Sequence, residues 1–252
     1  MKKRFWQKSL SVCLALLMTE ALFPAQFISV SAESGVSYID RHWDDDMEAV
    51  QSEIRYCTSY SWLSGDEDED LYSGWYVTKS GSRFNSSERL YVHGTVNIIL
   101  TDGVTLECLD GINVPSGSTL NIYGQSDGTG ELKAIADTNC VAAIGGNDGQ
   151  SNGTINIYGG KVTATADVDA AGIGSGDDAH AGNINIYGGT VNATGGSTSS
   201  DGGAGIGGGD EGECGTIYIY GGKVNATGGS SNSDGGAGIG GGNGGRINIS
   251  AT

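Results

Sequence analysis

Proline and basic residues are scarce in this sequence. Only 2 prolines accompany 45 glycines among 252 residues, which excludes collagen, because a collagen chain needs abundant proline and a glycine at every third position. Long packed helices are disfavoured too, since each glycine costs a helix about 1 kcal/mol relative to alanine. The 13 lysines and arginines are outnumbered by 30 acids, for a net charge of -17. Such an acidic chain is a poor partner for nucleic acid or an anionic membrane.

A long apolar run is also missing. The most apolar stretch, residues 10–23, contains Thr19 and Glu20 and is shorter than the ~20 residues that a membrane-spanning helix needs. It follows a basic start and precedes the small residues Val30, Ser31 and Ala32, the layout of a secretory signal peptide. We therefore predict that residues 1–32 are a cleaved signal peptide. The mature protein is expected to be secreted or held at the cell surface, without membrane insertion.

Cysteine is sparse, and one of the five cysteines lies in the predicted signal peptide. The remaining even number permits two disulfides with three possible pairings in an exported chain. No C-x-x-C pair occurs, so we expect structural or unpaired thiols rather than a metal role, and the pairing stays open. The four cysteines are Cys57, Cys108, Cys140 and Cys214.

The sequence does have a repeat. The motif G-T-I-N-I-Y-G-G at residues 153–160 returns, slightly changed, at residues 182–189 and 215–222. Each period contains three short segments, of which the first two alternate apolar and polar residues, as half-buried strands do. Glycine pairs and clusters of Asp, Asn and Ser separate the segments, as turns require. The inward positions would be Ile155 and Ile157, then Val162 and Ala164, then Ala171 and Ile173, with their equivalents in later repeats.

A period near 30 residues lets each turn of the chain pair in parallel with the next, roughly 4.8 Å away, and parallel crossovers are right-handed by default. We predict an all-β protein: a right-handed parallel β-helix with three strands per coil and about five coils over residues 90–252. Residues 33–89 lack the repeat and are expected to form an N-terminal cap region that covers the first edge. The chain stops one strand into a new coil, so we expect the helix to be truncated at its C-terminus.

Several of these stretches resemble a known group of proteins. Residues 74–77 (G-W-Y-V), 89–103, 111–125 and the G-A-G-I-G-G-G repeats are similar to secreted β-helix surface proteins of Gram-positive gut bacteria. The resemblance covers about residues 74–252. It implies a carbohydrate-binding or adhesin-like role, and some related β-helix families bind calcium and acidic polysaccharide. It does not carry binding residues over to this chain.

Two outward columns on the first strand of each repeat are candidates for binding a polysaccharide or a cell-surface glycan. Tyrosine rings cover the apolar C–H faces of sugars, while amides hydrogen-bond sugar hydroxyls. The alternative is that stacked identical side chains hold neighbouring coils together. The candidate carbohydrate-binding residues are Tyr123, Tyr158, Tyr187, Tyr220, Asn121, Asn156 and Asn185.

Acidic residues in the glycine-rich turns are candidates for a metal site. Calcium takes six to eight oxygen ligands, and such turns offer carboxylates together with backbone carbonyls. The metal candidates are Asp177, Asp178, Asp210 and Glu211, and the alternative is that they are solvated turn acids. No cofactor is required by this interpretation, although Ca²⁺ could bind.

The outward strand positions carry Asn, Thr, Tyr, Lys and Gly rather than the paired carboxylates of β-helix hydrolases. We therefore predict a noncatalytic carbohydrate-binding module and not an enzyme. The alternatives are a structural, adhesin-like repeat stalk that makes protein contacts and, less favoured, a calcium-dependent polysaccharide lyase. The third segment of each repeat, A-G-I-G, would leave a bare glycine-rich face on which a partner protein could lie closely.

Overall fold

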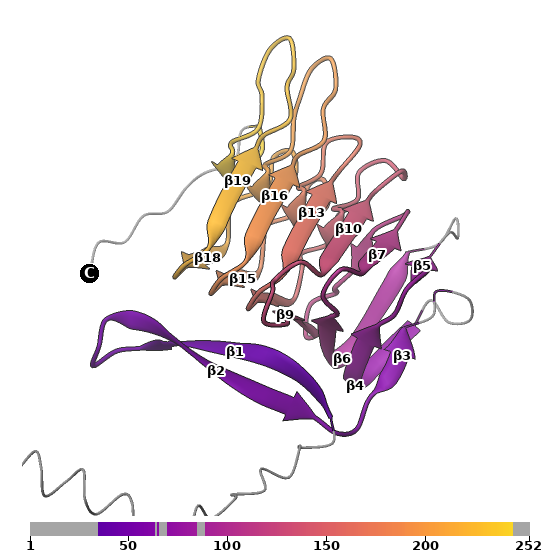
Figure 1. Cartoon of the computed structure of the whole chain (residues 1–252). Helices are drawn as coiled ribbons and strands as arrows, with labels where there is room; N and C mark the ends of the chain where they lie inside the picture. Colours follow the sequence, from indigo (N-terminus) through magenta and orange to yellow (C-terminus); the bar gives the residue numbers. More distant parts are fainter. Residues whose placement is uncertain (1–34, 64, 66–69, 85–88, 244–252) are drawn as a thin grey trace, which may run out of the picture. The chain divides into compact units, whose positions relative to one another are not determined.

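The computed structural model describes residues 35–63, 65, 70–84 and 89–243, and its regular elements are all β-strands (Figure 1). In the described part of the chain, no helix is long and apolar enough to cross a membrane. Cys57, Cys108, Cys140 and Cys214 are all free thiols, so neither of the two possible disulfides is formed.

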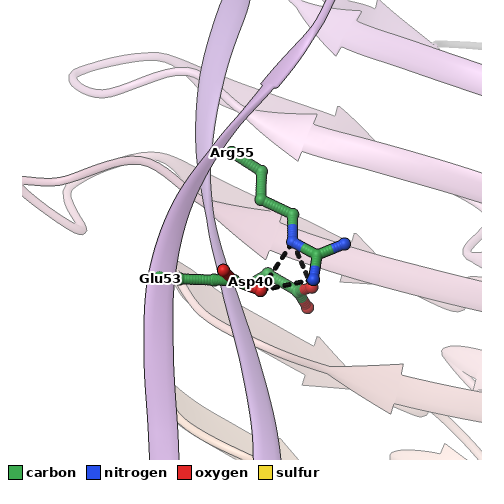
Figure 2. A network of polar contacts seen from close by, with 3 residues as sticks. All are labelled: Asp40, Glu53 and Arg55. Atoms are coloured by element: carbon green, nitrogen blue, oxygen red, sulfur yellow. Dashed lines mark hydrogen bonds and ion pairs between the residues drawn. The ribbon is translucent and has the colours of Figure 1, made fainter.

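The first element is an antiparallel hairpin of β1 (Val36–Asp44) and β2 (Ala49–Cys57), paired from Val36 with Cys57 to Asp44 with Ala49. Its turn is closed by the Asp44 carboxylate, which accepts the N–H groups of Asp46 and Met47 at 3.0 Å each, as Asp does in turns. On the hairpin, Arg55 pairs with Asp40 at 3.0 Å and with Glu53 (Figure 2). These exposed ion pairs contribute little to stability.

The rest of the described chain winds into coils whose strands all pair in parallel with the coils before and after them. Face one carries β9 (Thr119–Gly124), β12 (Thr154–Ile157), β15 (Asn183–Ile186) and β18 (Thr216–Ile219). Face two carries β5 (Arg83–Phe84), β7 (Thr105–Cys108), β10 (Glu131–Ile135), β13 (Lys161–Thr165), β16 (Thr190–Thr194) and β19 (Lys223–Thr227). Face three carries the two-residue strands β8 (Ile112–Asn113), β11 (Ile144–Gly145), β14 (Ile173–Gly174), β17 (Ile206–Gly207) and β20 (Ile239–Gly240).

This arrangement confirms the predicted right-handed parallel β-helix with three strands per coil. The stack of face-two strands from β5 to β19 can be followed in Figure 1. Strand β6 (Leu90–Leu100) turns a corner within one strand, since its start pairs with β8 and its end with β9. From β6 to β20 the described chain makes five coils, the number expected.

Parallel stacking begins earlier in the chain than the repeat does. Strand β4 (Asp70–Thr78) pairs in parallel with β6, and β3 (Ser61–Leu63) pairs in parallel with β4, although residues 33–89 were expected to be a cap region. The pairing of β4 with β6 shifts register between Tyr72 and Gly74.

The core is a column of small and branched apolar side chains inside the coils. Ile155, Ile157, Val162, Ala164 and Ile173 are all fully buried, as their inward positions predict. Burying one isoleucine side chain contributes roughly 1.5–3 kcal/mol. The equivalent residues of successive coils stand directly above one another, for example Ile155 above Leu120 and below Ile184.

Backbone conformation and close contact between coils require the glycines of face three. Gly145, Gly174 and Gly207 are buried and have φ of +146°, +145° and +136°, where side chains are strained. A Cβ on any of them would lie 1.8–1.9 Å from the carbonyl oxygen of the next coil's glycine. Close stacking of the coils therefore requires these glycines, whereas a protein contact on this face stays a prediction.

Candidate functional site

The asparagines predicted to bind sugar form an amide ladder along face one. Each Nδ2 donates to the Oδ1 of the preceding asparagine: Asn121 to Asn97 at 2.8 Å, Asn156 to Asn121 at 2.7 Å and Asn185 to Asn156 at 2.8 Å. The ladder ends on the backbone, where Asn97 donates to the carbonyl oxygen of Gly74 at 3.1 Å. One donor and one acceptor of Asn121 and Asn156 are thus already used between coils.

The four tyrosines predicted to bind sugar stack on one another and form a tyrosine ladder. The ring centroids of Tyr123 and Tyr158 are 4.5 Å apart, those of Tyr158 and Tyr187 are 5.0 Å apart, and those of Tyr187 and Tyr220 are 4.9 Å apart. The planes of these pairs differ by 3°, 4° and 11°. Each inner ring therefore has a tyrosine on both of its faces and turns its edge outward.

The hairpin packs against the two ends of this ladder. Tyr38 of β1 meets Tyr123 edge-on, with ring centroids 4.9 Å apart. Trp75, which belongs to β4 of the coils and not to the hairpin, stacks on the same ring at 5.2 Å. At the other end, the ring of Trp43 lies 5.4 Å from that of Tyr220. Tyr123 is only 8% exposed as a result, and Tyr158, Tyr187 and Tyr220 are half-buried.

Between the two ends, Arg41 holds β1 to the coils. Its Nη1 donates to the carbonyl oxygen of Tyr158, and burial lowers the pKa of the guanidinium from its usual value. A Cβ on Gly159 would lie 2.6 Å from Arg41 Nη1, and one on Gly188 would lie 2.8 Å from Arg41 Cδ. The glycine pairs after the tyrosines therefore make room for the hairpin.

Burial raises the pKa of tyrosines in this ladder. It raises that of Tyr158 to about 12, with the neighbouring Tyr187 adding to the shift, and raises that of Tyr123 further. Tyrosine is neutral at physiological pH even without these shifts, and their direction reflects how far the phenols are removed from water. Together with the ring stacking and the hairpin, this placement favours the cohesion role of the two ladders over a sugar-stacking platform.

Face two carries a different set of side chains, none of which was among the predicted carbohydrate-binding residues. Outward residues of β10, β13, β16 and β19 lie in register on successive coils, so that Thr165, Thr194 and Thr227 form one row. Lys161 pairs with Glu131 at 2.8 Å, and Asn225 donates to Asn192 at 2.7 Å. The face-two surface is defined as Lys133, Lys161, Thr163, Thr165, Thr190, Asn192, Thr194, Lys223, Asn225 and Thr227, all exposed or half-exposed.

The acidic turn residues separate into two pairs. Asp178 and Glu211 have positive φ of +52° each and are exposed, whereas Asp177 and Asp210 are partly buried and face other acids. Burial, with Asp201 second, raises the pKa of Asp210 to about 6, and burial raises that of Asp177. The ligand atoms of Asp177, Asp169 and Cys140 lie within 4.8 Å of one another. Asp169 and Cys140 were not among the predicted metal residues.

Comparison with known protein families supports the interpretation of the repeat as a β-helix repeat. A family model described as a beta helix repeat matches residues 155–177, 184–210 and 217–246. Each of the first two stretches runs from face one through face two to face three and the turn that follows, so the matched unit corresponds to one coil. No curated protein and no solved structure matches this chain. The chain therefore carries beta helix repeats, a fold that hosts many unrelated activities.

Proposed function

We propose that this chain is a noncatalytic β-helix module that acts outside the cell and binds polysaccharide or a cell-surface glycan through its face-two surface. The observation that supports the proposal most is the repetition of hydroxyl, amide and amino groups in register on successive coils of face two. Such groups donate to and accept from sugar hydroxyls. A long glycan that lies across the coils would meet a threonine hydroxyl at three successive coils, from Thr165, Thr194 and Thr227, beside rows of lysine, threonine and asparagine.

Rigidity of the sheet adds to this argument. The side chains of face two stand on strands that pair on both sides with neighbouring coils, as β13 does with β10 and β16. A preformed surface loses less conformational freedom on binding than a flexible loop does. Lys133 and Lys161 pair with Glu107 and Glu131 on the same face, so this surface offers hydrogen-bonding groups without a strong net charge, which suits a neutral glycan.

The proposal is tested by affinity electrophoresis through gels that contain soluble plant or bacterial polysaccharides. Wild-type protein should be retarded, and the double variant Asn192→Ala, Thr194→Ala should bind about tenfold more weakly, which is 1.4 kcal/mol and corresponds to one or two hydrogen bonds. The matched control is Asn183→Ala, Thr216→Ala, which removes exposed polar groups from face one. Equal retardation of both variants would contradict the assignment to face two.

A structural, adhesin-like stalk is the second candidate. It is favoured by the use of both face-one ladders for contacts between coils and with the hairpin. In this case no glycan retards the wild-type protein, and coils can be added or removed without loss of activity. Retardation by at least one glycan separates the two candidates.

A further inference from the structure

A second set of polar groups lies where the turns on either side of face three meet. Cys140 and Asp169 occupy equivalent places on adjacent coils, four residues before Ile144 and Ile173, which are paired. Asp177 follows Ile173 by four residues, on the other side of the short strand β14. Because β14 is only two residues long, side chains from both turns can converge.

The backbone holds these turns together. The N–H of Asp177 donates to the carbonyl oxygen of Cys140 at 3.1 Å, and the N–H of Cys140 donates to that of Val168 at 3.1 Å. On the next coil, the N–H of Asp210 donates to the carbonyl oxygen of Asp169 at 2.6 Å. The Sγ of Cys140 and one carboxylate oxygen each of Asp169 and Asp177 then lie within 4.8 Å of one another.

Two enclosed carboxylate oxygens in this region have no hydrogen-bond donor within the residues that the structure describes. Oδ1 of Asp169 and Oδ1 of Asp210 are both enclosed by protein, yet neither accepts a hydrogen bond in the described part of the chain. Both aspartates are partly exposed, so only these two oxygens, and not the whole carboxylates, are cut off from solvent. Enclosed carboxylate oxygens that no N–H or O–H reaches are positioned to bind a cation.

Charge in this region is of one sign. Asp169, Asp177 and Asp201 all lie near enough to Asp210 for their charges to interact with its carboxylate. Among the described residues, none of these four carboxylates forms an ion pair with a lysine or arginine. Neutralisation has to come from protons or from a bound ion.

We propose that Cys140, Asp169 and Asp177 bind a divalent metal ion of the Zn²⁺ class, with Asp210 beside it. Zn²⁺ holds a thiolate at ~2.3 Å and a carboxylate oxygen at ~2.0–2.2 Å, so in tetrahedral coordination its ligand atoms are about 3.5 Å apart. Small side-chain rotations bring the observed groups to that spacing. Water would complete the coordination.

The thiol decides which ion is bound. Calcium prefers oxygen ligands only, whereas zinc and other borderline metals take thiolate together with carboxylate. A cysteine thiol has a pKa of about 8.5 and is mostly protonated at physiological pH, whereas the form that binds a metal is the thiolate. Binding therefore exchanges one proton for the ion: the S–H bond breaks, the metal–sulfur bond forms, and the proton passes to the buffer.

The test uses the whole reduced protein, titrated with Zn²⁺ by calorimetry and with Co²⁺ by absorption spectroscopy. One Zn²⁺ per chain should bind, with an enthalpy that depends on the ionisation heat of the buffer because a proton is released. Co²⁺ should give a thiolate charge-transfer band. The band should vanish in Cys140→Ser and persist in Cys214→Ser, whose free thiol lies outside the cluster.

The carboxylates are tested with near-isosteric changes. Asp169→Asn should weaken Zn²⁺ binding at least tenfold, whereas Asp167→Asn, an exposed acid in the same turn, should not. Far-ultraviolet circular dichroism of each metal-free variant shows whether it is folded. Absence of Zn²⁺ binding, unchanged binding in Cys140→Ser, or preferential binding of Ca²⁺ would each overturn the proposal.

Discussion

At the scale of single residues, glycine has a role in this protein that its abundance alone does not reveal. Gly145, Gly174 and Gly207 stand above one another on face three, each at a φ that side chains rarely adopt. The space next to each is filled by the carbonyl oxygen of the adjacent coil. Glycine thus sets how closely the coils approach at this face.

Gly174→Ala should destabilise the β-helix by about 1–3 kcal/mol or more, since the added methyl group would overlap the carbonyl oxygen of Gly207. The control is Gly149→Ala, where φ is +65° and no atom lies within 4 Å of the added Cβ. That variant isolates backbone strain, which costs roughly 1–2 kcal/mol. Urea unfolding compares the two, and equal losses would show that contact between the coils is not what requires the glycine.

At the scale of elements, the hairpin of β1 and β2 changes the interpretation of face one, because it contacts the tyrosine ladder that was predicted to bind sugar. It contacts the tyrosine ladder at both ends and in the middle, through Tyr38, Trp43 and Arg41. In a further contact, Nε2 of Gln125 in the coils donates a hydrogen bond to the carbonyl oxygen of Ser37 in β1 at 2.9 Å. The ladder that the sequence offers as a ligand platform therefore supports an element of the protein itself.

The double variant Arg41→Ala, Trp43→Ala should loosen this hairpin while leaving the coils intact. Its amide hydrogens should exchange faster with solvent, whereas those of β12 and β13 should keep their protection, because local opening follows local contacts. Arg55→Ala is the matched control, since the ion partners of Arg55 both lie on the hairpin (Figure 2). Unchanged exchange in the double variant would mean that these contacts do not hold the hairpin.

The coils could be predicted from sequence because their information is local and repeated. Alternation around Ile155 and Val162 gives the strands, and the spacing of the copies gives the pairing of neighbouring coils. The hairpin could not be predicted, since it carries no repeat and its contact from Arg41 to Tyr158 spans 117 residues. A signal for the cluster did exist: Cys140 and Asp169 precede paired isoleucines by the same four residues.

At the scale of the whole molecule, the faces of the β-helix have different tasks. Face one is covered in part by the hairpin, and its amide and tyrosine ladders bind coil to coil. On face three, glycines let adjacent coils stack closely. The turns beside face three contain Asp169 and Asp210, each with an enclosed oxygen that accepts no hydrogen bond from the described residues. The face-two surface keeps its polar side chains exposed or half-exposed, and it is the surface to which our proposal assigns the glycan.

Lysine acetylation in the presence and absence of a glycan that retards the protein tests this assignment most directly. Lys161 and Lys223 lie on the face-two surface, and Lys79 is an exposed lysine outside it. Mass spectrometry should show that saturating glycan slows acetylation of Lys161 and Lys223 several-fold and leaves Lys79 unchanged. If bound glycan does not slow the acetylation of Lys161 and Lys223, the assignment of the glycan to face two is wrong.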